Sequence, residues 1–504
     1  MGISTQEIVA GHSFSGLSKD TLTYGIALIL ERIISFLIIP VITKSLPPEF
    51  YGIWSQILVT IGILSPLVLL GFCSAIVRFL AGENSPYQKA KIFNWMTIAV
   101  LISCAVIGGI GLLFKSQVSS LIFGYSNLYK YVYLLFLFLL IDSFFELAMS
   151  LLRAERKIFR LSVYYFIKHT IRPLALFVVL WVFHWEFWVS LLVIAIMQMC
   201  VIVWVYYREI FSNIGAIFSF ESVPVREILS FSLPLVPYAL SMWGNNFLNR
   251  YIVVYILGLK EVSIYGVVWS LASISVVFYS AIGYILYPYL TKSWEIKDIK
   301  AVKSNLEKGI FCYLFFVFPL PVILTFFNKE IISLISTSYY IPDWKTTFLI
   351  SFSVLLFGLY QISIFSVLLK KQTVLVFWTS FIALIINILF SLWLIPKFGL
   401  VGAGISLVLS NAFLAGWALV MTKRIVDFRL NWQSAGKILF TSLGMMIVFL
   451  SGEYFLKTKL NDFFVLVSVI TAGLLTYVFL NLIGKNSFVF EFFRSKFLKE
   501  NRKI

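Results

Sequence analysis

The sequence predicts an all-α, polytopic membrane protein of about fourteen transmembrane helices: two six-helix lobes related by a pseudo-two-fold axis, then two C-terminal helices. Three observations support this fold class. Of the 504 residues, 60% are hydrophobic and only 12% are charged, which is about half the charge of an ordinary soluble domain. Apolar runs of membrane-spanning length recur along the whole chain, and landmarks in the first six runs return in the next six. The composition therefore excludes a water-soluble globular protein.

Each predicted helix is based on an apolar run long enough to cross the hydrocarbon core of a bilayer, which takes about 20 residues. The first run is too long for the apolar part of a signal peptide, so we expect residues 1–20 to form a retained cytoplasmic tail. In order along the chain, the predicted spans are 21–43, 52–77, 92–114, 127–152, 161–183, 186–207, 228–257, 262–288, 309–327, 347–369, 374–395, 400–422, 437–456 and 463–484.

The net charge of +17 is distributed unevenly between the two sides of the predicted membrane. The N-terminal tail, every second loop and the basic C-terminal tail 485–504 contain 27 Lys and Arg residues, whereas the alternate loops contain nine. Positive charge accumulates on the cytoplasmic side of membrane proteins, so both termini are predicted to be cytoplasmic. The basic excess then reflects orientation and contact with anionic membrane lipids, and nucleic acid is not an expected partner.

A six-helix unit is predicted to occur twice. Tyr51-Gly52, which follows the first loop, returns as Tyr265-Gly266, 214 residues later (265 minus 51). At the same offset a basic residue closes the second and eighth helices, and a basic pair follows the fourth and tenth. Because six is an even number, both copies have the same orientation, and a cavity is expected between them. The predicted parts are an N-lobe (21–207), a cytoplasmic connector (208–227), a C-lobe (228–422) and a C-terminal helix pair (423–484).

Charged side chains inside the predicted spans are candidate functional residues, because each ionised group costs at least about 2.5–3.5 kcal/mol at the bilayer centre. Residues four apart share one helix face, which applies to both carboxylates of the fourth span and to the Lys and Arg of the fifth. Two interpretations stay open: a functional site, or structural ion pairs within the first lobe. The residues are Glu31 and Arg32 in the first span, Asp142 and Glu146 in the fourth, Lys168, His169 and Arg172 in the fifth, and Arg250, beside Asn249, in the seventh.

Several motifs of the chain resemble those of a known transporter family. The first span has a central Arg32 and a late Pro40, the next loop ends in Tyr-Gly, and the second span ends in Gly71-x(6)-Arg-Phe. The stretch LIPKFGLVGAGIS (394–406) contains a Pro-x-x-Gly-x-x-Gly-Ala motif before the twelfth span, whereas VFHWEFWVS (182–190), before the sixth, departs from this pattern. Over about residues 18–430 the sequence resembles the Wzx-type polysaccharide flippases of the multidrug/oligosaccharidyl-lipid/polysaccharide exporter superfamily.

This resemblance implies a transporter rather than an enzyme. It would flip a polyprenyl-diphosphate-linked oligosaccharide from the cytoplasmic to the outer leaflet by alternating access, in the synthesis of a cell-surface polysaccharide such as O-antigen. The expected location is the cytoplasmic (inner) membrane, and the expected partners are the lipid-linked oligosaccharide, membrane lipids and the polysaccharide polymerase machinery. No cofactor and no metal are expected.

The chemistry of a diphosphate suggests roles for the intramembrane charges. A guanidinium group binds phosphate oxygens through two parallel hydrogen bonds. We expect the headgroup to be bound by Arg32, Arg250, Lys168, Arg172 and Asn249. Glu31, Asp142 and Glu146 would balance this charge or carry a coupling proton, because neighbouring buried carboxylates raise each other's proton affinity. The alternatives are static pairing of Arg32 or Arg172 with Asp142 or Glu146 and snorkelling of Lys168 or Arg250 to the interface. In addition, Trp243 and Trp269 are candidates for stacking on sugars.

Two other functions are weighed against this prediction. A cation-coupled multidrug exporter of the same superfamily would need an apolar or acidic cavity, and the basic residues in the spans disfavour it. A membrane glycosyltransferase or polysaccharide polymerase would need a sizeable external loop, but the longest here is about 328–346. The phosphate-binding pattern GxxxxGK[ST] is absent, so no ATP is expected, and the four cysteines lack metal or disulfide spacing.

Overall fold

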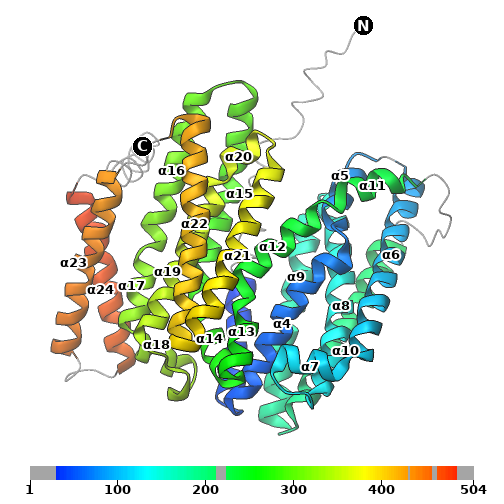
Figure 1. Cartoon of the computed structure of the whole chain (residues 1–504), viewed down its shortest axis with the longest axis horizontal. Helices are drawn as coiled ribbons and strands as arrows, with labels where there is room; N and C mark the ends of the chain where they lie inside the picture. Colours follow the sequence, from blue (N-terminus) through cyan, green and yellow to red (C-terminus); the bar gives the residue numbers. More distant parts are fainter. Residues whose placement is uncertain (1–29, 84, 212–222, 429–431, 457–461, 485–504) are drawn as a thin grey trace, which may run out of the picture. The chain divides into compact units, whose positions relative to one another are not determined.

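A computed structural model of the chain describes residues 30–83, 85–211, 223–428, 432–456 and 462–484. The regular structure of these residues is helical (Figure 1). By the contacts between its residues the chain forms two compact units. The first comprises residues 1–247 and 258–260, and the second comprises residues 248–257 and 261–504.

The first unit is organised around helix α8 (Tyr129–Ala154), which packs against four longer helices and two nine-residue helices. Its buried positions run along the whole helix, from Tyr131 to Ala154. The central position of α8 is functionally relevant because it carries Asp142 and Glu146. The other elements are a helical turn at 30–36, α3 (Ile38–Thr43), α4 (Pro48–Leu69), α5 (Phe72–Leu80), α6 (Pro86–Leu113), α7 (Lys115–Phe123), α9 (Ile158–Phe177) with its π-helical extension (Val178–Val182), α10 (Phe187–Val205) with a second such extension (Tyr206–Phe211), α11 (Val225–Ser232) and α12 (Leu235–Phe247).

The second unit is organised around α19 (Trp344–Ser363), which packs most extensively against α22 (Leu400–Val426). The C-terminal helices α23 (Trp432–Leu456) and α24 (Asp462–Ile483) pair with each other, and α23 also contacts α16 and α17. The remaining elements are α13 (Asn249–Leu257), α14 (Leu259–Ala272), α15 (Ile274–Glu295), α16 (Ile299–Val317), α17 (Pro319–Phe326), α18 (Asn328–Ile335), a short 3₁₀ turn (Ser338–Tyr340), α20 (Phe365–Leu369) and α21 (Thr373–Phe398). The first two residues of α14 belong to the first unit.

Twelve helical segments of the described residues are long and apolar enough to cross a membrane, and they coincide with twelve of the predicted spans. The predicted span 21–43 begins outside the described residues. The predicted span 228–257 is divided among α11, α12 and α13, each too short to cross a membrane alone. Pro234 lies at the first division, where proline removes a backbone donor and disfavours helix in the preceding residue.

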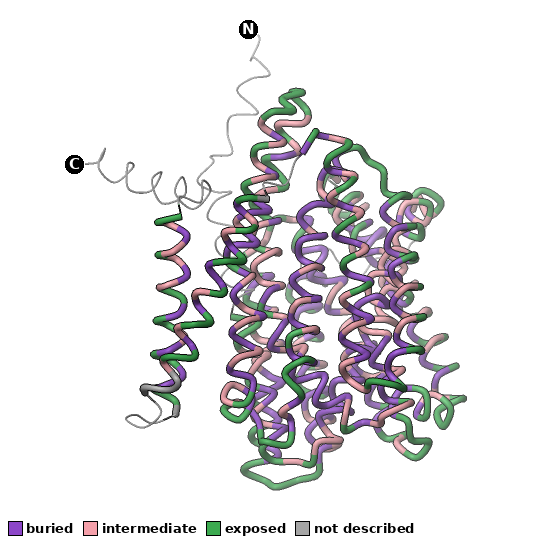
Figure 2. The backbone as a smooth tube through the Cα atoms, turned by 60° about the vertical axis from the view of Figure 1, so that its left-hand side comes forward, coloured by how far each residue is buried: buried purple, intermediate pink, exposed green. Residues whose placement is uncertain are grey.

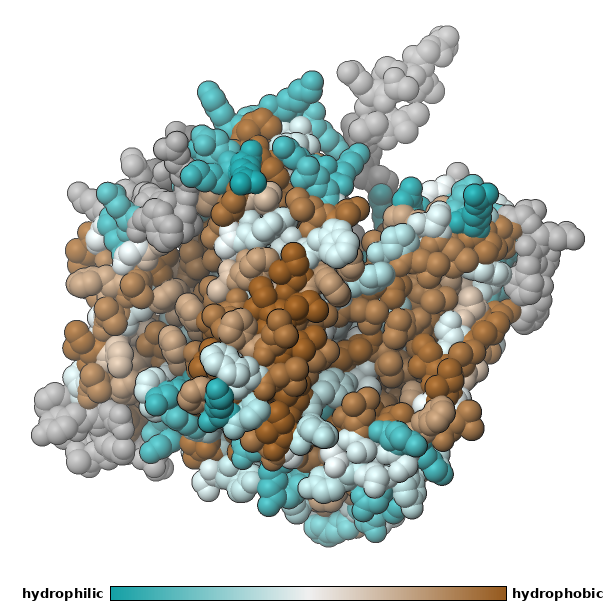
Figure 3. All heavy atoms as spheres, in the orientation of Figure 1, coloured by the Kyte–Doolittle hydropathy of each residue, from teal (hydrophilic) through white to brown (hydrophobic). Residues whose placement is uncertain are grey.

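The surface agrees with a multi-pass membrane protein. Apolar side chains cover the broad middle of the visible face, and hydrophilic residues gather at the ends of the helices (Figure 3). Figure 2 shows buried positions alternating with exposed ones along the same helices, and many of the exposed positions are large hydrophobic residues such as Leu113, Phe159 and Leu475. Such side chains are expected where a helix faces lipid rather than water.

The order of elements in the first unit returns in the second. A long helix, a short helix and another long helix follow one another as α6, α7 and α8, and again as α16–α17, α18 and α19. Lys115 begins α7, and Lys329 lies in the first turn of α18 at the same 214-residue offset as the Tyr-Gly pairs. The division into two lobes by duplication stays a prediction, and α12, expected in the second lobe, is part of the first unit, where it packs on α4.

Candidate substrate-binding site

The first unit contains an ionic centre formed by α8 and α9. Asp142 of α8 lies 2.9 Å from Nζ of Lys168 and 3.3 Å from an NH2 nitrogen of Arg172, both on α9. Lys168 and Arg172 are four residues apart, so they lie on one face of α9 and can reach the same carboxylate. One anion is thus held by two cations.

The two cations of this centre are buried on aromatic rings. Lys168 is 5% exposed and Arg172 is 8% exposed, so Lys168 does not reach the interface as the snorkelling alternative required. The Lys168 Nζ lies 4.1 Å from the centre of the Phe145 ring, and the Arg172 guanidinium carbon lies 5.9 Å from the Trp54 ring. A desolvated cation over an aromatic face gains about 2 kcal/mol, which offsets part of the burial penalty.

Arg172 retains an unsatisfied donor. Its Nε is buried and has no hydrogen-bond partner among the described residues. Buried polar groups are normally paired, and an exception indicates a ligand, a water or a functional role. Since one nitrogen of the guanidinium already contacts Asp142, the free Nε is a donor available to another anion.

Glu31 and Glu146, the other two carboxylates predicted as site residues, have neutral partners or a histidine. Glu31 lies 3.2 Å from Nε2 of His169, whose Nδ1 is 3.2 Å from the Ser35 hydroxyl. Glu146 accepts a 2.9 Å hydrogen bond from the hydroxyl group of Tyr165. The rings of Tyr165 and His169 stack, with centroids 6.3 Å apart, so these contacts form one continuous group with the ionic centre. We call Glu31, Asp142, Glu146, Lys168, His169 and Arg172 the charge cluster.

Arg32 has a different environment. It is exposed, and it forms no ion pair with any acidic side chain in the described part of the chain. Of the structural ion pairs considered for Arg32 and Arg172, the Arg172–Asp142 pair is present. Asp142 and Glu146 have other partners than Arg32. Arg32 is therefore a cation at the margin of the charge cluster that is not committed to a described carboxylate.

Arg250, in the second unit, is enclosed by aromatic and amide side chains. It is 5% exposed, and its guanidinium carbon lies 5.2 Å from the Tyr265 ring and 5.7 Å from the Trp269 ring. The neighbouring Asn249 is fully buried and donates a 3.1 Å hydrogen bond to the Tyr265 hydroxyl group. Tyr265 belongs to the repeated Tyr-Gly landmark, so this landmark contributes to the surroundings of a buried cation.

Sequence reasoning missed the residues that position the charges. Phe145 and Tyr165 were not singled out, although each lies within four residues of a predicted charge on the same helix, a spacing that places it beside that charge. Of the two tryptophans predicted to stack on sugars, Trp269 lies under Arg250 and Trp243 stacks on Phe247 at 4.5 Å. Trp243 also presses against Gly62 of α4, where a Cβ atom would lie 2.6 Å from the indole ring.

Comparison with known proteins gives the family. Residues 17–294, more than half of the chain, match the family described as "Polysaccharide biosynthesis protein". The chain belongs to this family. Its members are transporters of the multidrug/oligosaccharidyl-lipid/polysaccharide exporter superfamily. This family membership excludes a membrane glycosyltransferase or polysaccharide polymerase. This result confirms the resemblance drawn from Arg32, the Tyr-Gly pair and the Gly-x(6)-Arg-Phe motif.

Solved structures share its fold at low sequence identity. The lipid II flippase MurJ, in an inward closed conformation, matches with a TM-score of 0.75 and 15% identity, covering 92% of this chain and 98% of that one. An inward-facing multidrug resistance MATE family transporter of the MOP superfamily matches with a TM-score of 0.67 and 14% identity, covering 79% and 94%. A MOP superfamily transporter from Pyrococcus furiosus has a TM-score of 0.60 and 12% identity over 81% and 94%.

Among curated proteins, an uncharacterized membrane protein of Methanocaldococcus jannaschii is 26% identical over 232 residues. The match spans 44% of this chain and 44% of that relative.

Proposed function

We propose that this family member flips a polyprenyl-diphosphate-linked oligosaccharide from the cytoplasmic to the outer leaflet by alternating access. It would serve the synthesis of a cell-surface polysaccharide in the cytoplasmic membrane, with both termini in the cytoplasm. Fourteen spans arranged as two six-helix lobes and a C-terminal pair are part of the proposal. Similarity in fold to a lipid II flippase supports a lipid-linked substrate.

The observation that carries the proposal is the buried basic surface of the first unit. Arg172 presents an unpaired buried Nε beside Lys168, and Arg32 lies uncommitted at the margin of the same cluster. A diphosphate offers several oxygens to such donors, and charge-assisted hydrogen bonds are roughly twice as strong as neutral ones. When no substrate is bound, Asp142 offsets the charge of this surface, because burying an unpaired cation costs much more free energy than burying a paired one.

Arg32 is the proposed first contact of the headgroup. Its exposed guanidinium is accessible to an arriving headgroup, and the planar fork matches phosphate geometry. Arg250 and Asn249 supply a second cationic position in the second unit. Aromatic rings around Arg250 exclude water, which strengthens its attraction for an anion.

The coupling proton is assigned to Glu146 and Glu31 rather than to Asp142. Asp142 is held by two cations, and a carboxylate in that setting stays ionised. Glu146 and Glu31 instead contact a tyrosine hydroxyl and an imidazole, and neither forms an ion pair with a Lys or Arg among the described residues.

The test is flipping in proteoliposomes that contain a polyprenyl-diphosphate-linked oligosaccharide, followed by cleavage with an impermeant glycosidase added outside. Wild-type protein should increase the rate at which the glycan becomes accessible above that of protein-free vesicles. Arg32→Ala should abolish the increase, and Arg32→Lys should restore part of it, because a point charge lacks the bidentate fork. Absence of any increase with wild-type protein would refute the proposed function.

A matched control separates Arg32 from a general effect of lost charge. Arg153 is also exposed and lies in the last turn of α8, so Arg153→Ala should flip at the wild-type rate. The same vesicles loaded with a lipophilic cationic dye test the multidrug-exporter alternative. Dye export that is driven by an ion gradient, without flipping of the glycan lipid, would favour that alternative.

A further inference from the structure

The first unit contains a second candidate site, away from the charge cluster. It is a cavity of about 680 Å³ at the ends of α4, α8 and α10, where the chain turns at 44–47, 124–128 and 183–186. Its size lies within the roughly 300–1,000 Å³ typical of small-molecule sites. The predicted topology places this end of the unit outside the cytoplasm.

The floor of the cavity is aromatic and fixed. Phe50 and Phe187 meet edge to face with centroids 5.3 Å apart, and Tyr131 packs on Phe187 at 6.1 Å. Leu259 completes the lining next to α4, where Gly52 permits the approach: a Cβ atom on Gly52 would lie 2.5 Å from the Leu259 carbonyl oxygen. The Gly of the Tyr-Gly landmark therefore has a packing role at the base of this cavity.

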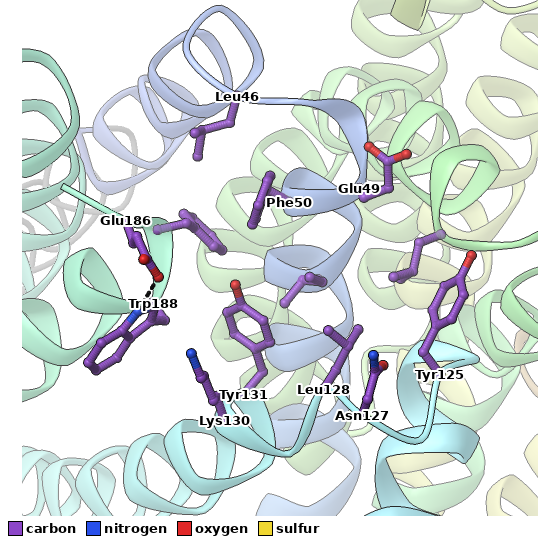
Figure 4. A pocket seen from close by; sticks show the side chains of 13 residues that line it. Leu46, Glu49, Phe50, Tyr125, Asn127, Leu128, Lys130, Tyr131, Glu186 and Trp188 are labelled. Atoms are coloured by element: carbon purple, nitrogen blue, oxygen red, sulfur yellow. Dashed lines mark hydrogen bonds between the residues drawn. The ribbon is translucent and has the colours of Figure 1, made fainter. Parts of the chain in front are cut away.

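The walls of the cavity combine rings with hydrogen-bonding groups. Figure 4 shows Trp188 and Glu186 on one side and Tyr125 and Asn127 on the opposite side, with Lys130 near Tyr131 between them. The Trp188 indole N–H donates to Glu186 at 2.6 Å, which fixes the ring. The Lys130 Nζ lies 5.4 Å from that ring.

The charges around the cavity are balanced. Glu49 lies 3.5 Å from Lys260, and Glu186 has Lys130 on the other side of the Trp188 ring. A diphosphate would require an excess of cations, and a cationic drug would require an excess of carboxylates. The arrangement instead suits a neutral ligand with many hydroxyl groups and apolar C–H faces, because carboxylate, amide and phenol groups bind hydroxyls while rings cover C–H surfaces. That description fits a sugar.

The sequence departs from the family pattern at this cavity. The second copy opens α22 with Leu400-Val401-Gly402, and a Cβ atom on Gly402 would lie 2.3 Å from the Leu394 carbonyl oxygen. The first copy opens α10 with Phe187-Trp188, directly after Glu186. At the 214-residue offset, Gly402, which permits close packing at the start of α22, corresponds to Trp188, which lines the cavity.

We infer that this cavity is a sugar-binding subsite that takes a neutral pyranose unit of the transported glycan at the outer end of the first unit. The inference builds on the proposed function and adds a contact for the glycan, separate from the contacts for the diphosphate. Sugar binding at the outer end would favour the conformation that releases the headgroup there, since a ligand shifts an equilibrium toward the state that it binds better.

The experiment measures binding of free sugars to the purified full-length chain in detergent, by saturation-transfer NMR titration. The probes are maltose, cellobiose and N,N′-diacetylchitobiose. At least one should bind, and Trp188→Ala and Tyr125→Ala should each raise its Kd about tenfold, the scale of one lost aromatic contact. Tyr125 is 53% exposed, so its variant keeps the test valid if Trp188→Ala does not fold.

Matched controls lie on the same surface but outside the cavity. Trp185 is 54% exposed and Tyr129 is 44% exposed, so Trp185→Ala and Tyr129→Ala should leave the Kd unchanged. Inorganic diphosphate and tetraphenylphosphonium should not displace the sugar. The inference is overturned if none of the three sugars binds, if the cavity variants bind like the controls, or if either charged probe competes.

The outcome is distinguishable from that of the proposed function. Flipping of the lipid-linked glycan by a protein that binds no free sugar would overturn the subsite alone. If the wild-type protein binds a free sugar but flips nothing, and Trp188→Ala loses this binding, the flippase proposal is overturned and the subsite stands.

Discussion

The two units of the chain stabilise their interiors by different chemistry. In the first, α8 and α9 are joined through ionised groups: Asp142 with Lys168 and Arg172. In the second, α19, α21 and α22 are joined through small neutral side chains. These contacts include Ser391 to Ser406 at 2.8 Å, Asn387 to Ser410 at 3.3 Å, Asn411 to the Ser353 carbonyl at 3.1 Å, and Thr422 to the Ser363 carbonyl at 2.9 Å.

The difference indicates which contacts are structural and which carry function. Small hydroxyl and amide groups are the ordinary means of packing membrane helices, and each hydrogen bond contributes on average about 0.6 kcal/mol. A neutral network of that kind would have sufficed in the first unit as well. Buried ion pairs cost desolvation and often stabilise less than apolar replacements. This contrast supports the proposal that the charge cluster serves an anionic substrate.

The largest effect is expected from Asp142→Asn, which leaves Lys168 and Arg172 buried without their carboxylate. Removing one partner of a buried pair costs about 3–5 kcal/mol, so the variant should lose most of its thermal stability in detergent, measured as the monodisperse fraction after heating. Asp427, which is exposed and lies 3.7 Å from Lys303, provides the control: Asp427→Asn should melt like the wild type. If Asp142→Asn is as stable as the wild type, the ionised contacts of the first unit do not differ in energy from the neutral contacts of the second.

A companion variant separates function from stability at the same place. Asp142→Leu combined with Lys168→Met and Arg172→Met replaces the ions by apolar side chains, which is often neutral or stabilising. The triple variant should therefore be at least as stable as the wild type but inactive in flipping. Wild-type flipping by this variant would show that the ionic centre does not bind substrate.

The second largest effect is expected from Arg250→Lys. The lysine keeps the charge but not the planar group that lies over Tyr265 and Trp269. The flipping rate should fall about tenfold, which corresponds to the loss of about 1.4 kcal/mol, with little change in melting. Arg424, which is exposed in the last turn of α22, is the control, and Arg424→Lys should flip normally. Equal flipping rates for Arg250→Lys and Arg424→Lys would show that Arg250 has a structural role and does not bind the substrate.

Glu146→Gln tests the assignment of the coupling proton. The amide cannot ionise but can still accept from Tyr165, so the fold should persist while the dependence of flipping on an imposed pH gradient disappears. The readout is the ratio of flipping rates with and without the gradient, measured in the same vesicle preparation. Glu31→Gln is measured in parallel. A gradient effect that persists in both variants would locate coupling elsewhere in the chain.

The smallest effect is expected in the neutral network of the second unit. Asn387→Ala removes its hydrogen bonds to Ser410 and Ser391. At about 0.6 kcal/mol for each bond it should destabilise the protein by only about 1.2 kcal/mol, seen as a small decrease in melting temperature. Flipping should be unchanged. A double-mutant cycle with Ser410→Ala isolates the bond, and a coupling energy as large as that of the Asp142 contacts would contradict the proposed difference between the units.

Local properties of the chain could be predicted from the sequence. Membrane character follows from hydrophobicity, so twelve of the predicted spans coincide with helices of the right length and polarity. The charges of the fourth, fifth and seventh spans stood out because ionised groups are rare in apolar helices. The family resemblance rested on Arg32, Tyr51-Gly52 and Gly71, each recognisable by spacing alone.

Only the tertiary structure decided which residues meet. The sequence allowed Asp142 or Glu146 to pair with Arg32 or Arg172, but pairing depends on how each helix is rotated about its axis, and α9 turns Lys168 and Arg172 together toward α8. The cavity lined by Glu186 and Trp188 likewise depends on contacts between distant segments, such as Gly52 against Leu259. Hydrophobicity determines that a segment enters the membrane, whereas packing between helices determines which of its side chains face one another.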